Sequence, residues 1–153
     1  MQIKTSYFYQ IRNFKPWMIP ISTAIGDPDW YKPPAGKEWF RDKRGVINGL
    51  KYKPLIVQYD CNMLCPICEE KDILKGNCFT MLEYRKALDT INKDTMYKAF
   101  EHCINYFKLP FDDNEPMIVL MVHEAPQNPC SERIALQDYF KCEELKYPIE
   151  DNY

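Results

Sequence analysis

The chain has 153 residues, the length of one ordinary domain, and a domain of this size buries roughly two-thirds of the surface of its unfolded chain. Apolar residues make up 46% and charged residues 27%, which predicts a packed core and excludes a disordered chain. Twenty basic against twenty-two acidic side chains give a formal net charge of −2. This balance argues against a nucleic-acid binder that is basic over its whole surface.

The sequence has no sign of a membrane or secretory segment. No apolar run approaches the roughly twenty residues of a membrane span, and the first residues lack the pattern of a signal peptide. We therefore expect a cytoplasmic protein with no membrane partner. The seven cysteines are then expected as thiols or thiolates, because the cytoplasm is reducing.

The first third of the chain predicts strands and a long loop. Residues Gln2 to Tyr9 predict a first strand, and the short apolar run from Trp17 to Ser22 predicts a second, buried one. From Gly26 to Gly49 no period is sustained, which predicts a long ordered loop of a kind that is often functional. Residues Pro54 to Tyr59 predict a third strand.

The second half predicts three helices and a central strand. A helix is expected from about Thr80, where a capping box begins, and another from about Asp94, where apolar residues recur every three or four positions. The continuous apolar run Met117 to Val122 predicts a central parallel strand. Ser131 is expected to cap a last helix that runs to about Lys141.

Strands that alternate with helices predict a fold of the α/β class. We expect one domain over residues 1–153, a Rossmann-like three-layer sandwich with a mostly parallel sheet, and an inserted four-cysteine loop over residues 60–79. The sequence has neither a G-x-G-x-x-G fingerprint nor a P-loop. It therefore does not use the common devices for binding dinucleotides or nucleoside triphosphates.

Four cysteines fall at spacings of four, three and ten residues: Cys61, Cys65, Cys68 and Cys78. Such closely spaced thiolates can converge on one zinc ion at about 2.3 Å, and four of them leave no open position, so the site is expected to be structural. The alternatives are ordinary buried thiols and an iron–sulfur cluster, because C-x3-C-x2-C also resembles the motif of radical S-adenosylmethionine enzymes. Those enzymes use a much longer barrel and three cluster cysteines, whereas Cys78 offers a fourth ligand, which favours zinc.

Three stretches carry a resemblance to a known family. They are T-S-Y-F at Thr5 to Phe8, P-I-S-T-A-I-G-D-P-D-W-Y at Pro20 to Tyr31, and V-L-M-V-H-E-A-P-Q-N-P-C-S-E-R at Val119 to Arg133. In this order they resemble the uncharacterised bacterial and viral family called domain of unknown function 488. The four-cysteine segment looks like the insertion of a subgroup.

The loops that carry these motifs are expected to meet, because loops at the carboxyl ends of parallel strands line one crevice. The candidate ligand-binding residues are Ser6, Ser22, Asp27, Trp30, Tyr31 and Ser131. Among them, Trp30 and Tyr31 are expected to offer rings that stack on a base or sugar. The alternative role of Trp30 is to anchor its loop.

The candidate catalytic residues are Glu124, Cys130 and Arg133. Cys130 precedes the start of a helix, where the helix dipole and Arg133 favour a thiolate. Glu124 is expected to act as a base or to orient Arg133. The alternatives are a structural ion pair between Glu124 and Arg133 and a small packed residue at Cys130.

Two hypotheses of function follow. The first is an enzyme or sensor for a nucleotide-like or other anionic small ligand in the crevice. The second is a non-enzymatic module that binds nucleic acid or protein through the zinc loop and the basic segment of residues 32–53.

Overall fold

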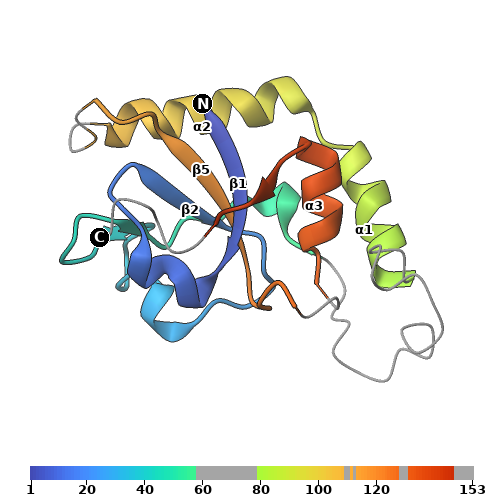
Figure 1. Cartoon of the computed structure of the whole chain (residues 1–153), viewed down its shortest axis with the longest axis horizontal. Coiled ribbons are helices and arrows are strands. Elements are labelled where there is room, and N and C mark those ends of the chain that lie inside the picture. The colour runs from blue at the N-terminus through green and yellow to red at the C-terminus, as the bar shows by residue number, and fades with distance from the viewer. Residues whose placement is uncertain (58–78, 109–110, 112, 128–130, 147–153) are drawn as a thin grey trace.

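The computed structural model describes residues 1–57, 79–108, 111, 113–127 and 131–146. Four strands form one parallel sheet in the order β2-β5-β1-β6 (Figure 1). They are β1 (Gln2–Tyr7), β2 (Met18–Ser22), β5 (Met117–Val122) and β6 (Glu143–Glu144). The predicted α/β class and mostly parallel sheet are confirmed.

The central strand β5 is buried over its whole length. Its sequence M-I-V-L-M-V places Ile118, Leu120 and Val122 in the core on one face of the sheet. Met117, Val119 and Met121 alternate with them and belong to a second core on the opposite face. A parallel strand that is covered on both faces needs such a continuous apolar run.

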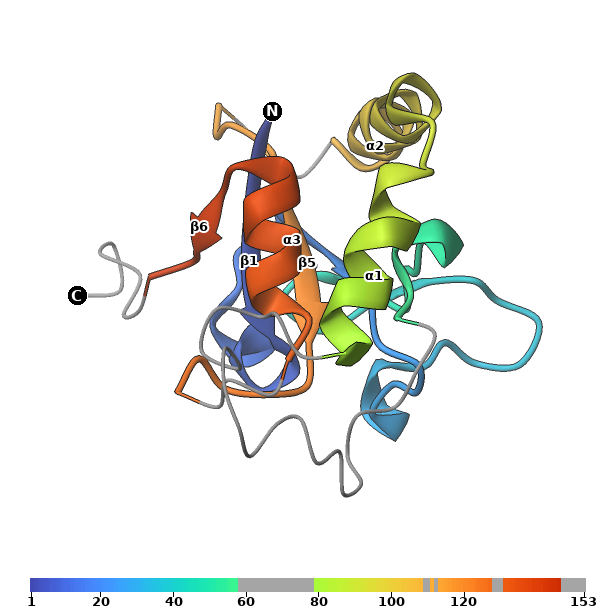
Figure 2. The same ribbon diagram turned by 90° about the vertical axis from the view of Figure 1, so that its right-hand side faces the viewer.

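Three helices cover the first of these faces: α1 (Phe79–Asp89), α2 (Lys93–Phe107) and α3 (Arg133–Phe140). Figure 2 shows α1 and α3 side by side over β1 and β5. The start of α2 is fixed by Asn92, whose side chain accepts a hydrogen bond from Thr95 N at 3.0 Å. No helix in the described residues is long and apolar enough to cross a membrane.

The opposite face is covered by short irregular elements. The 3-10 turns η1 (Phe8–Asn13) and η2 (Asp29–Tyr31) place Phe8 and Tyr31 in its core. The segment predicted as a loop from Gly26 to Gly49 contains η2 and a small antiparallel pair. The strands of that pair are β3 (Phe40–Arg41) and β4 (Ile47–Asn48).

The predicted strand from Pro54 to Tyr59 is wrong over residues 54–57, the part that the structure describes. A 3-10 turn, η3 (Lys53–Leu55), stands there, and Leu55 N donates to Tyr52 O at 3.0 Å. Pro54 stands in the first turn of η3, where its fixed φ favours a helical turn and its missing N–H is not needed. Residues 58–78, which include most of the predicted four-cysteine loop, lie outside the described part of the chain.

Candidate functional site

The connections that leave β1 and β5 run to opposite edges of the sheet: β1 is followed by β2 at one edge, and β5 by β6 at the other. Residues 8–17 carry the chain from β1 to β2 across the irregular face, where Phe8, Ile11 and Phe14 pack. The connection from β5 to β6 runs through α3 on the helical face. In open α/β sheets, ligands bind outside the carboxyl ends of the strands at such a topological switch point. The carboxyl ends of β1 and β5 therefore define the candidate site.

Arg133 lies at this point and is 5% exposed. It is the first residue of α3, and its Cζ lies 5.9 Å from the ring centre of Tyr7 at the end of β1. Nη2 donates to the main-chain oxygen of Glu124, in the loop after β5. Nε donates to Oε1 of Glu144 at 2.7 Å. Nη1 is buried and has no hydrogen-bond partner among the described residues.

Glu124 and Arg133 are in contact as expected, but through the main chain of Glu124 and not through an ion pair. Glu124 orients the guanidinium through its carbonyl group, whereas its carboxylate atom Oε1 is buried and has no hydrogen-bond partner in the described structure. The carboxylate that pairs with Arg133 belongs to Glu144. Nothing in the sequence marked Glu144, because β6 consists of two acidic residues and has no apolar pattern.

Glu144 belongs to a polar network beneath α3. Thr5 Oγ1 donates to Glu144 Oε1 at 2.8 Å and accepts from Gln137 Nε2 at 2.8 Å. Burial raises the pKa of Glu144, and the charge of Arg133 opposes the rise. Beside the network lies an open depression of about 540 Å³, which is lined by Gln137, Cys142, Glu143, Glu144, Leu145 and Lys146.

A second buried carboxyl group, Glu132, lies next to Arg133 and was not among the predicted site residues. It is 6% exposed, and its Oε2 lies 3.2 Å from Thr23 Oγ1 in the loop after β2. Burial raises its pKa to about 7, and the charge of Glu124 adds to the rise. The S-E-R sequence contains Glu132, but its hydrogen-bond partner Thr23 is 109 residues away, so no local pattern marked the contact.

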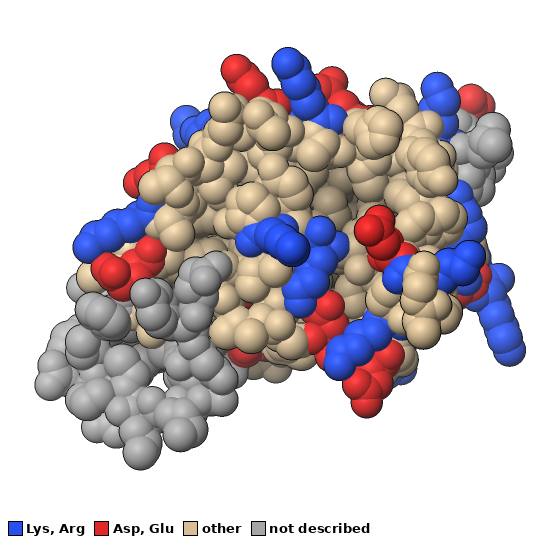
Figure 3. All heavy atoms as spheres, turned by 180° about the vertical axis from the view of Figure 1, so that it is seen from behind, with Lys and Arg blue, Asp and Glu red and all other residues tan. Residues whose placement is uncertain are grey.

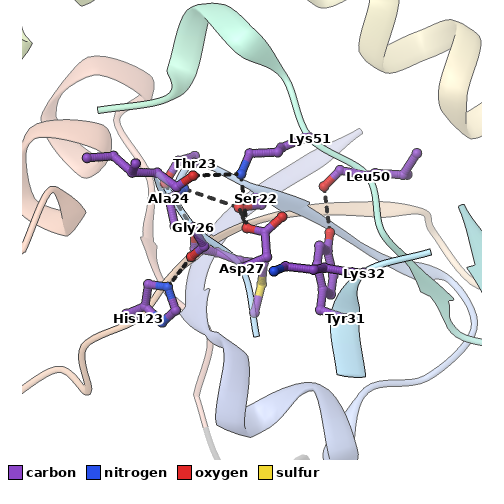
Figure 4. Close-up of polar contacts among 12 residues, drawn as sticks. Ser22, Thr23, Ala24, Gly26, Asp27, Tyr31, Lys32, Leu50, Lys51 and His123 are labelled. Atoms are coloured by element: carbon purple, nitrogen blue, oxygen red, sulfur yellow. Dashed lines mark hydrogen bonds and ion pairs between the residues drawn. The ribbon is translucent and has the colours of Figure 1, made fainter. Parts of the chain in front are cut away.

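The loop after β2 is held by a polar cluster that Figure 4 shows. Ser22 Oγ donates to Asp27 Oδ1 at 2.5 Å and accepts from Ala24 N at 3.1 Å. Lys51 Nζ forms an ion pair with the same Asp27 oxygen at 3.2 Å. Two of the candidate ligand-binding residues, Ser22 and Asp27, thus contact each other, and their hydrogen bonds support the loop.

The predicted aromatic residues Trp30 and Tyr31 differ in exposure. Trp30 is 53% exposed, and its ring stands almost perpendicular to the rings of Phe8 and Tyr31. Tyr31 is fully buried, and its hydroxyl donates to Leu50 O at 2.6 Å. Burial raises the pKa of Tyr31 well above its usual value. Tyr31 therefore anchors the loop, and the expectation that its ring stacks on a ligand does not fit a buried side chain.

His123, directly after β5, lies on the same side of the sheet as Trp30. Its ring centre lies 4.9 Å from that of Phe8, and Nε2 contacts the carbonyl oxygen of Gly26 (Figure 4). The imidazole is exposed. Trp30 and His123 thus both pack on Phe8, the first residue after β1, and both remain accessible.

The remaining predicted residues are placed as follows. Ser131 is buried, and its Oγ accepts from Arg133 N at 3.2 Å. It was predicted to cap the last helix, but the cap position of α3 is held by Glu132, one residue later. Ser6 is buried within β1, opposite Met121. Cys130 and the four predicted metal ligands, Cys61, Cys65, Cys68 and Cys78, lie outside the described residues. In the part that is described, no three histidine, cysteine or acidic side chains group closely enough to hold a metal.

The basic segment of residues 32–53 is partly neutralised by carboxylates. Lys32 pairs with Asp29 at 3.3 Å, and Arg44 pairs with Asp42 at 2.7 Å. On the face in Figure 3, lysine and arginine side chains stand among acidic and uncharged ones. They do not form one continuous basic patch there.

Comparison with known proteins gives no relative: no family model, curated protein or solved structure matches this chain. The resemblance to the domain of unknown function 488 family stays a prediction from the three motifs.

Proposed function

We propose that the protein binds a small anionic, nucleotide-like ligand at the switch point between β1 and β5 and acts on it as an enzyme or senses it. The observation that carries this proposal is the buried Nη1 of Arg133, which has no hydrogen-bond partner among the described residues. A buried donor without a partner is costly. A phosphate or carboxylate oxygen would satisfy it, and the planar guanidinium is well suited to such groups.

The accessible rings of Trp30 and His123 support a ligand that also carries a flat ring. Trp30 is held edge-on by two buried aromatic residues, so its orientation is fixed before a ligand binds. An ordered indole loses little conformational freedom when a base stacks on it. Arg133 on one side of the sheet and Trp30 on the other would contact the two ends of one nucleotide-like molecule.

The proposal extends to the architecture and the metal. A Rossmann-like three-layer sandwich is supported by the parallel sheet and its switch point, with turns η1 and η2 in place of a second helical layer. A structural zinc ion held by Cys61, Cys65, Cys68 and Cys78 is supported by their spacing and by their soft thiolate ligands. An iron–sulfur cluster is the alternative.

The second hypothesis, a module that binds nucleic acid or protein, receives less support. Lys32, Arg44 and Lys51 in its proposed contact segment already pair with carboxylates of this chain. A phosphate backbone would have to compete with those ion pairs.

Binding of adenosine monophosphate (AMP) to the wild type, Arg133→Lys and Trp30→Ala tests the proposal. Lysine keeps the charge of Arg133 but cannot reproduce its fork of donors. We expect both variants to bind AMP more weakly than the wild type. Tyr106→Ala is the control, because Tyr106 is an exposed aromatic residue of α2. Equal binding by all four folded proteins would contradict the site.

A further inference from the structure

Glu132 lies between the loop after β2 and the start of α3. Its Oε2 is 3.2 Å from Thr23 Oγ1, and its Oε1 is 3.5 Å from Ser131 Oγ. The Thr23 hydroxyl also lies 3.0 Å from the main-chain oxygen of Met121, the fifth residue of β5. This hydroxyl therefore stands between a carbonyl oxygen and a carboxyl oxygen, and only the carboxyl group can gain a proton.

The arrangement is satisfied whether Glu132 is charged or neutral. A hydroxyl group donates one hydrogen bond and can accept others. When Glu132 is charged, Thr23 donates to it, and Met121 O keeps the bond from Thr23 N at 3.1 Å. When Glu132 is protonated, it donates to Thr23 Oγ1, and the Thr23 hydroxyl turns to Met121 O. Only hydrogen atoms have to move between the two states.

We propose that Glu132 is a proton-exchanging residue of the candidate site, and that the Thr23 hydroxyl accommodates both its charged and its neutral form. The role toward a ligand rests on the proposed function, whereas the proton exchange itself does not. A carboxyl group that changes charge without moving its neighbours suits acid–base chemistry, because the geometry of the site is kept through the cycle.

The charged and titratable groups around Glu132 agree with this role. They are Glu124 in the loop after β5, Arg133 on α3 and Tyr84 on α1. Burial and then the charge of Glu124 raise the pKa of Glu132 to about 7, while the Thr23 hydroxyl and Arg133 oppose the rise. A carboxyl group that titrates near neutral pH can both donate and accept a proton there.

The direct test is a nuclear magnetic resonance titration of the side-chain carboxyl carbon of Glu132 in ligand-free wild type. The signal is assigned through the backbone, so no variant has to fold for the assignment. We expect a midpoint near 7. A midpoint below about 5, in the ordinary range of glutamate, would overturn the proposal.

Two substitutions of Thr23 test the effect of its hydroxyl on the protonation of Glu132. Thr23→Val removes the hydroxyl that stabilises the charged carboxylate, so the midpoint of Glu132 should move to still higher pH. Thr23→Ser keeps a hydroxyl and should leave the midpoint close to that of the wild type. Equal midpoints in the valine and serine variants would contradict the stabilisation of charged Glu132 by the Thr23 hydroxyl.

The pH dependence of stability gives an independent readout. Because the folded state raises the pKa of Glu132 from 4.5 to about 7, the folded protein binds the extra proton, and stability falls as pH rises through this window. Between pH of about 5 and about 8, the ratio of folded to unfolded protein should fall roughly 10- to 100-fold more in the wild type than in Glu132→Gln. If stability depended on pH in the same way in the wild type and in Glu132→Gln, the proton exchange by Glu132 would be contradicted. A midpoint near 7 in a protein that fails to bind AMP would sustain the exchange and contradict the ligand site.

Discussion

Arg133 Nε and Glu144 Oε1 lie 2.7 Å apart and join the first residue of α3 to the edge strand β6. Arg133 is almost completely buried, whereas Glu144 is 21% exposed. A buried guanidinium needs such a partner because its charge is costly to remove from water. The pair therefore holds Arg133 in place at the switch point and leaves Nη1 for another acceptor.

Loss of Glu144 should destabilise the protein. Glu144→Ala leaves the Arg133 charge buried without its carboxylate and removes the acceptor of the Thr5 hydroxyl. We expect the free energy of unfolding to fall by about 1–3 kcal/mol, measured by urea denaturation. The neighbouring Glu143→Ala is the control. The Glu143 side chain is 77% exposed, and its ion pair with Lys4 is long, at 4.0 Å. Similar losses in both variants would argue against a structural role of the buried pair.

The hydroxyl of Tyr31 should matter for the loop after β2. Tyr31→Phe removes the hydrogen bond to Leu50 O and leaves that carbonyl without this donor in a buried place. The expected loss of unfolding free energy is about 1–2 kcal/mol. Tyr9→Phe should leave stability unchanged, since Tyr9 is largely exposed. A Tyr31→Phe protein as stable as the wild type would contradict the anchoring role.

The main elements could be read from the sequence because their burial leaves a local pattern. The apolar run Met117 to Val122 predicted the central strand. The helix expected from about Thr80 is α1, but it begins at Phe79, so Thr80 lies inside the helix and is not its cap. The strand β6 was missed because Glu143 and Glu144 carry no apolar signal, and its pairing with β1 is set by α3. Sheet register across more than a hundred residues has no local signature.

The candidate site was predicted in part. The placing of Arg133 at the first turn of the last helix is confirmed. Glu132, Glu144 and Lys51 were missed because their environment comes from contacts with distant residues, as in the 109-residue separation of Glu132 and Thr23. Tyr31 was expected at the surface because a Trp-Tyr pair in a polar loop does not tell which ring turns inward.

Purified protein should contain about one zinc ion per chain by elemental analysis, because four thiolates complete a tetrahedral site. Cys68→Ser should lower the zinc content and the stability, since metal-binding energy realised only in the folded state adds to folding. Cys103→Ser should keep the zinc, because Cys103 lies on α2, away from the cluster in sequence. Stoichiometric iron with visible absorption, or a well-folded protein without metal, would contradict the zinc assignment.

The thiols of Cys103 and Cys142 should be slow to react. Burial raises the pKa of each to about 11, so only a small fraction is thiolate near neutral pH, and the thiolate is the nucleophile. We expect alkylation by iodoacetamide in the native protein to be much slower than in the urea-unfolded protein, as measured for each cysteine by mass spectrometry. Equal rates in both states would contradict the burial of these side chains.

The most direct test of the ligand site is a titration that follows the indole N–H of Trp30 and the Nε–H of Arg133 by nuclear magnetic resonance. AMP should shift both signals, inorganic phosphate should shift mainly Arg133, and adenosine should shift mainly Trp30. The Tyr106→Ala protein should respond as the wild type does, since Tyr106 lies on α2. If neither signal moves in the folded protein at AMP concentrations up to about 10 mM, where even weak complexes form, the anionic-ligand site is contradicted.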